Sequence, residues 1–222
     1  MSEWWTYSLS DFLLFSPRTY YRLFELYNVA IWPLQIVGLA LGVAVAGLLL
    51  RDVPWRGRAI AAALAACWLW VSLAYFQRRY ETINWAAGYF ALGFAVEALL
   101  LVWSGIVLDR LRFRPSSDLP GRAGLCIFLF ALFAYPLIGP LVGRSWLQVE
   151  LFGIAPDPTV VATLGVLAAA YRPHWELLVV PLVWCAIGGA TLWTMQSPDA
   201  AVMPVVAALA LVLAVWKTGL KL

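Results

Sequence analysis

Charged residues are scarce in this chain of 222 residues: Asp, Glu, Lys and Arg make up 12% of it, whereas a soluble domain carries about 25%. The sequence has one histidine, His174, which is too few for a bis-histidine haem or for most zinc sites. The three cysteines, Cys67, Cys126 and Cys185, are widely spaced within apolar runs, which argues against a disulfide framework and favours inert packing. We therefore expect no metal and no cofactor.

Other absences narrow the organisation of the chain. The sequence has no Gly/Ser linker, charge run or low-complexity tract, so residues 1–222 are expected to form a single membrane domain. The first residues lack the basic stretch and apolar core of a cleaved signal, so we expect the mature chain to begin near Met1. The net charge of +3 comes from loop arginines, which argues against a nucleic-acid partner.

Apolar and aromatic residues are abundant. Hydrophobic residues make up 64% of the chain, its mean hydropathy is +0.84, and it contains 13 Trp, 9 Tyr and 11 Phe. This composition predicts an all-α integral membrane helix bundle in a lipid bilayer, with aromatic rings where hydrocarbon meets headgroups. Seven apolar runs are the candidate transmembrane helices: residues 27–50, 59–76, 86–108, 123–142, 158–171, 175–195 and 200–216.

The first and fifth runs differ from a plain transmembrane helix. Residues 1–25 are expected to form an interfacial segment, with a short helix after Ser8 and a second that has Ser16 as N-cap and Pro17 as first residue. The first span should then kink near Pro33. The fifth run rises only about 21 Å, against a hydrocarbon core of about 30 Å, so it is expected to be a short or broken span.

Lys and Arg counts predict the orientation. With seven crossings, the side that holds the N-terminus carries five of these residues and the other side carries ten. Because basic loops are retained in the cytoplasm, we expect a multi-pass protein of the bacterial inner membrane with its N-terminus outside and its C-terminus inside. A re-entrant fifth run would shrink the bias to eight against seven, so the counts favour seven crossings.

A carboxylate lies in the middle of the third run. Glu97 would cost at least a few kcal/mol there unless it is protonated, paired or in contact with water. Together with Tyr89, Gly93 and Ser104 it forms a polar stripe about 80° wide that should face the bundle interior. Glu97 is therefore either a proton-carrying or substrate-contacting group, or a protonated side chain that hydrogen-bonds a neighbouring helix.

Two further polar faces are expected toward the outside. Glu25, Asn28 and Gln35 share one face of the first span, and Tyr75 and Arg79 share a face of the second. These side chains are candidates for an outward-facing polar cavity. The alternative for Glu25 is a solvated salt bridge with a nearby arginine.

The stretch GIAPDPT opens the fifth run with a carboxylate between two prolines. Asp157 is predicted to be the N-cap of a helix that begins at Pro158, and Thr159 and Thr163 share a face of that helix. Asp157 is then either a structural cap or, if the helix begins below the outer surface, part of a half-helix site for a small molecule or ion.

Glycines and prolines also indicate where helices bend and pack. The stretch YPLIGPLVGRSW predicts that the fourth span bends or unwinds at its outer end. Gly38 with Gly42, and Gly139 with Gly143, have the four-residue spacing that permits close helix contact, within the chain or in a homo-oligomer.

The stretches SLSDFLLFSPRTYYRLFELYN, YPLIGPLVG and FGIAPDPT resemble a family of small bacterial inner-membrane proteins of unknown function that are sometimes labelled permeases. With WPLQ, TLGVL and PLVWCAIGG, the similarity covers most of the chain. In that family the position of Asp157 is often cysteine, in a Pro-Cys-Pro-Thr run that suggests soft-metal handling, and the aspartate departs from this pattern. The resemblance implies a multi-pass topology and supplies no substrate.

These observations favour a small transporter or a ligand-binding membrane protein with an outward-facing polar cavity. A membrane-integral enzyme acting on a lipid or isoprenoid is less favoured, because the sequence shows no paired acidic motif, no histidine pair and no nucleophile with a base. An accessory subunit of a membrane complex, bound through aromatic and small-residue faces, is the third interpretation.

Overall fold

The structure is a computed structural model that describes residues 15–113 and 118–219. The α-helices of this part are α1 (Pro17–Ala30), α2 (Leu34–Leu50), α3 (Arg56–Trp70), α4 (Ala87–Leu101), α5 (Leu119–Leu129), α6 (Tyr135–Leu141), α7 (Pro156–Ala169), α8 (Trp175–Thr194) and α9 (Val202–Gly219). Shorter helical segments extend or connect them: η3 (Val71–Gln77), η4 (Tyr80–Thr82), η5 (Val102–Val107), η6 (Phe130–Ala134) and η7 (Trp146–Gln148).

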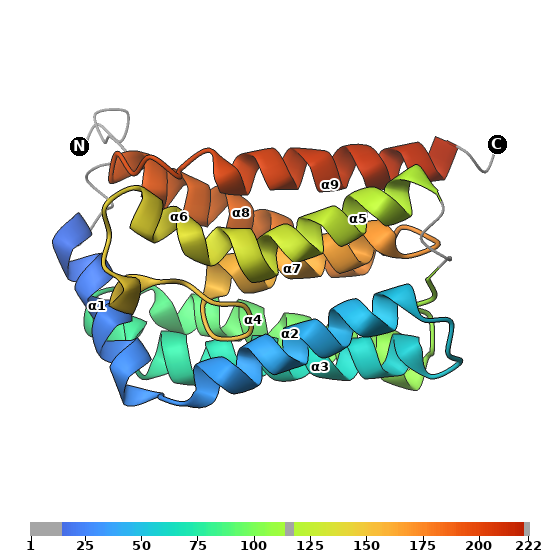
Figure 1. The fold of residues 1–222 in the computed structure, drawn as a ribbon, viewed down its shortest axis with the longest axis horizontal. Coiled ribbons are helices and arrows are strands. Elements are labelled where there is room, and N and C mark those ends of the chain that lie inside the picture. Colours follow the sequence, from blue (N-terminus) through green and yellow to red (C-terminus); the bar gives the residue numbers. More distant parts are fainter. Residues whose placement is uncertain (1–14, 114–117, 220–222) are drawn as a thin grey trace, which may run out of the picture.

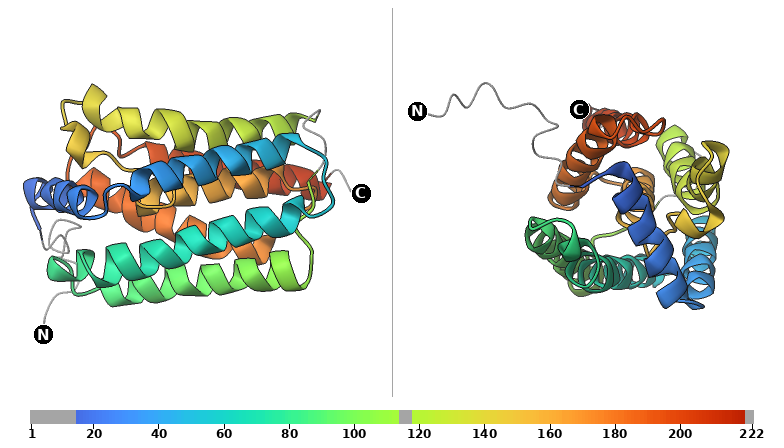
Figure 2. Two further views of the ribbon diagram at one scale, coloured as in Figure 1. Left: turned by 60° about the horizontal axis from the view of Figure 1, so that its bottom comes forward. Right: turned by 90° about the vertical axis from the view of Figure 1, so that its left-hand side faces the viewer.

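The long helices run along a common axis, and α1 lies across one end of the bundle (Figure 1 and Figure 2). We call this end the α1 end. It also holds η4 and the connection from α6 to α7 that contains η7, which we call the η7 segment. Within the described ranges, five helical stretches are long and apolar enough to cross a membrane, and α1 with α2, bent by 91°, makes a sixth candidate. The predicted all-α helix bundle is confirmed, and the fifth run, which was predicted to be short or broken, is the short helix α7. Because α7 is too short to count, the described residues hold five or six candidate spans against the seven predicted.

The start of α1 follows the sequence signal. Ser16 is its N-cap, with Oγ accepting a hydrogen bond from Thr19 N at 3.2 Å, and Pro17 is its first residue. Both were predicted. A serine N-cap accepts a hydrogen bond from a free backbone N–H of the first turn, and a proline at the first position has no N–H that would need a partner. The helix predicted after Ser8 lies outside the described residues.

The predicted start of the first span at residue 27 is wrong. Tyr27 belongs to α1, and the helix that runs along the bundle begins at Leu34. The chain turns at Pro33, where a proline lacks the N–H donor that a continuous helix needs. The predicted kink is therefore a full change of direction, which leaves α1 as a helix across the bundle end.

α7 is the axial helix of the bundle. All fourteen of its residues are buried, and the other helices surround it (Figure 2). At the α1 end, Tyr27 Oη donates a hydrogen bond to Ile154 O at 3.3 Å, just before α7 begins. At the opposite end, Tyr171 N donates to Arg112 O at 2.7 Å. The segment therefore connects the two ends of the bundle and does not turn back.

Small residues allow α7 to approach its neighbours closely. A methyl group added at Gly124 of α5 would lie 2.4 Å from a backbone atom of α7, and one added at Gly165 of α7 would lie 2.6 Å from a backbone atom of α5. Lys217 of α9 donates hydrogen bonds to the carbonyls of Ala168 and Ala170 at the end of α7. These carbonyls would otherwise lack a partner in a buried setting.

The fourth span is one helical stretch, from Leu119 through η6 to Leu141. Toward the α1 end it widens into the π-helical turn η6 just before Pro136, because proline cannot donate the hydrogen bond that a regular α-helix requires. The helix ends at Leu141, and Gly143 adopts a positive φ of 86°. The predicted bend or unwinding of this helix is thus present as a widened turn at η6 and as the end of the helix at Leu141.

The surface carries the features of a membrane protein. Large apolar side chains are exposed along α2, α4 and α9, where no other helix covers them. Many tryptophans lie near helix ends with much of their surface exposed, among them Trp32, Trp55, Trp85 and Trp193. Amphipathic rings at these positions fit the boundary between hydrocarbon and headgroups.

Candidate functional site at the α1 end

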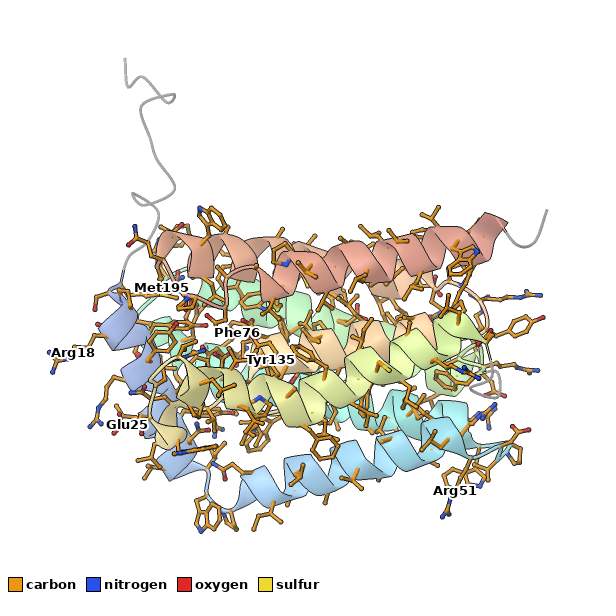
Figure 3. The ribbon with its side chains drawn as sticks, turned by 45° about the horizontal axis from the view of Figure 1, so that its top comes forward. Arg18, Glu25, Arg51, Phe76, Tyr135 and Met195 are labelled. Carbon is orange, nitrogen blue, oxygen red and sulfur yellow. The ribbon has the colours of Figure 1, made fainter. Side chains whose placement is uncertain are left out.

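Most of the predicted polar residues gather at the α1 end. Figure 3 shows Arg18 and Glu25 projecting from α1, while Arg51 lies at the other end of the bundle. Cavities at the α1 end contain Glu25 with Arg79, Asn28 with Gln35, and Tyr75. The predicted cluster is therefore divided among three neighbouring cavities.

The first cavity is a groove of about 720 Å³ between α1 and the segment that includes η4. We call it the arginine groove, after the four arginines that line it: Arg18, Arg22, Arg78 and Arg79. Glu25 pairs with Arg22 and accepts a hydrogen bond from Gln148 Nε2 at 3.4 Å. The hydrogen bond from Arg22 lowers the pKa of Glu25, so this carboxylate is charged and offsets one guanidinium.

The side chains of Asn28 and Gln35 donate hydrogen bonds to backbone carbonyls of the chain. Asn28 Nδ2 donates to Leu147 O at 2.9 Å and to Val149 O at 2.8 Å, and Gln35 Nε2 donates to Asn28 O at 2.7 Å. Both side chains border a groove of about 360 Å³ together with Trp32. Their amide donors fix α1 to the η7 segment and to α2.

A buried ion cluster lies beside these grooves. Arg144 forms ion pairs with Glu150, at 3.4 Å, and with Asp199, and its guanidinium lies 4.5 Å from the centre of the Tyr21 ring. Tyr21 Oη and Ser197 Oγ are 2.7 Å apart, and Ser197 Oγ hydrogen-bonds Asp199. The cluster joins α1, the segments on either side of η7 and the α8–α9 connection.

Sequence reasoning missed this cluster. Arg144 was used only as a topological charge, and Glu150 and Asp199 were not considered. A signal was present, since each of the three lies in a short polar connection between apolar runs, but nothing in the sequence pairs them. Burial, followed by the charge of Asp157, raises the pKa of Glu150 well above its ordinary value, and Arg144 offsets this in part.

Asp157 does not cap α7 as predicted. Ala155 is the N-cap and Asp157 is the second helical residue, because Pro156 already takes the first position. Its carboxylate accepts hydrogen bonds from Trp184 Nε1 at 2.7 Å and from Tyr135 Oη at 3.2 Å, and the residue is 1% exposed. Asp157 therefore links α7 to α8 and α6 below the α1 end.

The two threonines of α7 are fully used by the fold. Thr159 Oγ1 donates to Ala155 O at 2.7 Å and accepts from Gly153 N at 2.9 Å. Thr163 Oγ1 donates to Thr159 O at 2.8 Å and accepts from Trp68 Nε1 at 2.8 Å. These contacts order the start of α7 and leave no hydroxyl proton directed at a ligand.

Glu97 lies elsewhere. It is fully buried in α4, and neither carboxyl oxygen has a hydrogen-bond partner among the described residues. Of the two alternatives for Glu97, the hydrogen bond to a neighbouring helix is therefore absent from the described part of the chain. Tyr89, predicted on the same inward stripe, is 71% exposed, because α4 turns that side of its first turn outward. The three cavities of the α1 end are lined by neither Glu97 nor Asp157, so the two acids share none of them.

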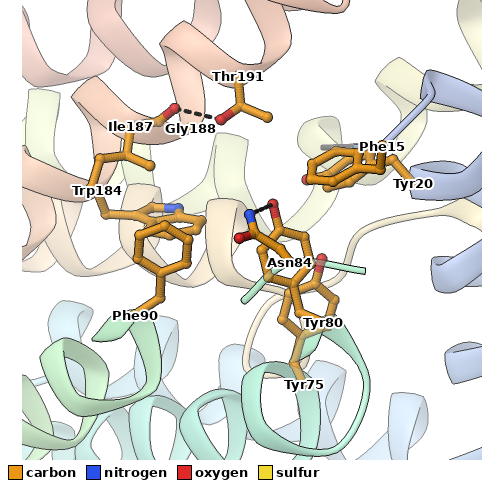
Figure 4. A pocket seen from close by; sticks show the side chains of 10 residues that line it. All are labelled: Phe15, Tyr20, Tyr75, Tyr80, Asn84, Phe90, Trp184, Ile187, Gly188 and Thr191. Carbon is orange, nitrogen blue, oxygen red and sulfur yellow. Dashed lines mark hydrogen bonds between the residues drawn. The ribbon is translucent and has the colours of Figure 1, made fainter. Parts of the chain in front are cut away.

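The third cavity at the α1 end is small and mostly aromatic. It measures about 50 Å³, and we call it the aromatic cavity. Its walls are Phe15, Tyr20, Tyr75, Tyr80, Asn84, Phe90, Trp184, Ile187, Gly188 and Thr191 (Figure 4). Tyr75, a predicted site residue, is 1% exposed, and its hydroxyl has no hydrogen-bond partner among the described residues.

Comparison with known proteins adds a family. A family model described as "Family of unknown function (DUF6064)" matches residues 18–221. The chain belongs to this family. No curated protein and no solved structure matches the chain. The family description names no activity and no permease-like label, so the transporter interpretation stays a prediction. Among the described residues, no group of three or more His, Cys, Asp or Glu side chains is placed to hold a metal ion.

Proposed function

We propose that this chain is a multi-pass membrane protein that binds a phosphate-bearing anionic ligand in the arginine groove. The observation that carries the proposal is the charge balance of the groove. Four arginines line it, and Glu25 pairs with Arg22, whereas Arg18, Arg78 and Arg79 form no ion pair with any described residue. Three guanidinium groups around a groove of about 720 Å³ thus form no ion pair with a carboxylate of the described residues.

Guanidinium chemistry defines the ligand class. A guanidinium presents a planar set of N–H donors that matches the oxygens of phosphate, often through two parallel hydrogen bonds. Like-charged arginines held near one another also repel, and a bound anion relieves that repulsion. A lipid headgroup and a free phosphate compound share this chemistry. The groove is open beside α1, whose Leu26 is 50% exposed, so either source can reach it.

The proposal concerns binding and does not include transport. A transporter needs a route for its ligand through the bundle, and the axial helix α7 is buried over its whole length. Glu97, the acid at mid-span, lines none of the three cavities of the α1 end. The expected orientation, with the α1 end outside, would place the groove on the outer face, and it rests on the count of basic residues.

Binding can be measured on the full chain in phosphatidylcholine nanodiscs. One arm titrates inorganic pyrophosphate by calorimetry, and a second measures retention of phosphatidylglycerol by native mass spectrometry. We expect the double variant Arg78→Gln/Arg79→Gln to weaken binding in the responding arm at least about tenfold, because a hydrogen bond to a charged group contributes about 1.5–3 kcal/mol.

A matched control separates the groove from general membrane electrostatics. Arg110 and Arg172 line a cavity of about 890 Å³ at the opposite end of the bundle. The variant Arg110→Gln/Arg172→Gln makes the same change in net charge and should leave binding within about twofold of wild type, since charges at that separation are screened. Equal losses in the two double variants, or no binding of either probe to the folded wild-type chain, would refute the proposal.

A further inference from the structure

The aromatic cavity is enclosed by three pairs of rings. Tyr20 stacks on Phe15 with ring centres 5.6 Å apart, Tyr75 stacks on Tyr80 at 5.7 Å, and Phe90 meets Trp184 edge to face at 5.4 Å. Figure 4 shows the Phe15 pair and the Trp184 pair on opposite sides of the space, with Tyr75, Tyr80 and Asn84 between them. The faces and edges of six rings from four segments of the chain therefore border one small cavity.

A carboxylate lies directly behind the cavity wall. Trp184, which forms part of the wall, donates its indole N–H to Asp157 at 2.7 Å. A methyl group added at the neighbouring wall residue, Gly188, would lie 3.4 Å from Asp157 Oδ1. Gly188 thus borders the cavity and also lies beside the carboxylate. The field of a negative charge therefore reaches the cavity.

The hydroxyl of Tyr20 responds to the same field. Burial, next the neighbouring Tyr75, and then the charges of Glu150 and Asp157 raise its pKa well above the ordinary value. The residues that line the cavity include no Lys, Arg or His. The space thus has nearby acids and no basic side chain in its wall, which disfavours an anion.

An unsatisfied hydroxyl marks the wall of the cavity. Tyr75 is 1% exposed, and its Oη makes no hydrogen bond of normal geometry among the described residues, although the Tyr20 hydroxyl lies close enough to interact with it. Buried hydroxyls are nearly always hydrogen-bonded, so an unpaired one beside a cavity points to a partner that occupies the space. Asn84 and Thr191 already use their polar atoms on Tyr80, Ala86 and Ile187.

From these observations we infer that the aromatic cavity binds a small organic ammonium ion. Ring faces attract cations, and the attraction strengthens when the cation is removed from water. Asp157 supplies the opposite charge across Gly188, and the Tyr75 oxygen can accept a hydrogen bond from an ammonium N–H. A volume of about 50 Å³, where a single water needs about 10–15 Å³, limits the ligand to a compact headgroup such as methylammonium or trimethylammonium.

This site is separate from the arginine groove and does not depend on the proposed function. The two cavities share no lining residue and have opposite charge preferences. The variant Arg78→Gln/Arg79→Gln should therefore leave ammonium binding unchanged. Failure of one proposal is thus distinguishable from failure of the other.

The test uses the full chain in dodecyl maltoside, which contains no ammonium group. Methylammonium, trimethylammonium and tetramethylammonium chlorides are titrated by calorimetry, and tert-butanol serves as a neutral molecule of about the shape and size of tetramethylammonium. We expect saturable binding of at least one ammonium ion and none of tert-butanol. Phe90→Leu should weaken binding about 2- to 30-fold, the range of a cation–π contact.

Two further variants test the charge and the fold. Asp157→Asn should remove the preference for the ammonium ion over tert-butanol. Phe128→Leu replaces a fully buried ring that packs on Phe152 and does not line the cavity. This variant should leave ammonium binding unchanged while it lowers the stability of the fold. The inference is overturned if the folded wild-type chain binds no ammonium ion, binds tert-butanol equally well, or loses binding equally in Phe90→Leu and Phe128→Leu.

Discussion

Replacement of Arg144 by glutamine removes the positive charge of the buried ion cluster. The side chains of Glu150 and Asp199 are 3% and 2% exposed, and that of Arg144 is 10% exposed, so water screens little of their interaction. At about 4 Å, two unit charges near a protein surface attract by about 4 kcal/mol. Removal of one partner from a buried pair typically lowers the free energy of unfolding by about 3–5 kcal/mol.

We place Arg144→Gln at the lower end of this range, because burial already disfavours the charged form of Glu150. Because the pKa of Glu150 is raised well above its ordinary value, this carboxyl binds a proton in the folded state over a range of pH where the unfolded chain has released it. Asp199 is then the main group that loses its counter-charge. We expect a loss of about 3 kcal/mol, or about 6–12 °C in Tm for a chain of this length.

The assay is thermal and denaturant unfolding of the full chain in one detergent, with a double-mutant cycle. Asp199→Asn removes the charge that Arg144 neutralises, so the double variant Arg144→Gln/Asp199→Asn should lose less than the sum of the single losses, by about 1–3 kcal/mol. A loss below about 0.5 kcal/mol for Arg144→Gln, or additive losses in the cycle, would contradict a buried and coupled cluster.

The same cluster predicts a pH dependence. An acid whose folded pKa is raised contributes stability below its ordinary pKa of 4.5 and loses that contribution as pH rises through the folded value. Stability should therefore fall as pH increases from about 4.5, and Glu150→Gln should flatten this part of the profile. A profile that is unchanged in Glu150→Gln would show that this carboxyl does not titrate as inferred.

Three further predictions use unfolding of purified variants. Gly124→Ala should lose about 1–3 kcal/mol, since the added methyl would overlap the backbone of α7, whereas Gly47→Ala, where nothing lies within 4 Å, should not destabilise the chain. Lys217→Met should lose about 1–3 kcal/mol, because two carbonyls at the end of α7 lose their donor, and a smaller loss would argue against that contact. Glu97→Gln should be as stable as wild type or more stable, since neither carboxyl oxygen has a partner among the described residues, and a clear loss would indicate an interaction of the carboxyl group.

Some elements of the fold were predictable from short stretches of sequence. Ser16 and Pro17 start α1 because capping depends on neighbouring residues alone. Pro33 ends it, although the size of the turn could not be predicted, since a proline excludes a straight helix without setting the new direction. The prediction that Asp157 is an N-cap failed for a similar reason. A helix can begin at Pro156 or at Pro158, and local sequence does not decide between these two starts.

The candidate site was predictable only in part. Glu25 and Arg79 do line one groove, and Tyr75 borders a cavity, because helical periodicity places residues on a face. Periodicity failed for Tyr89, which is exposed near the start of α4. Near a helix end, the boundary of the membrane accepts both polar and apolar side chains. The spacing of polar residues there predicts less about which side faces the bundle than the same spacing does at mid-span.

The sequence by itself determined that this protein is a membrane helix bundle. Few charges and long apolar runs can be read along the chain, and they are the properties that a helix needs to lie in a bilayer. The tertiary structure alone decided which polar groups meet. Arg144 and Asp199 are 55 residues apart, and they pair because the connections on two sides of α7 meet at the α1 end. Asp157 lies behind an aromatic cavity for the same reason: the packing of α8 on α7 brings Trp184 and Gly188 to it, and that packing depends on shapes distributed over the whole bundle.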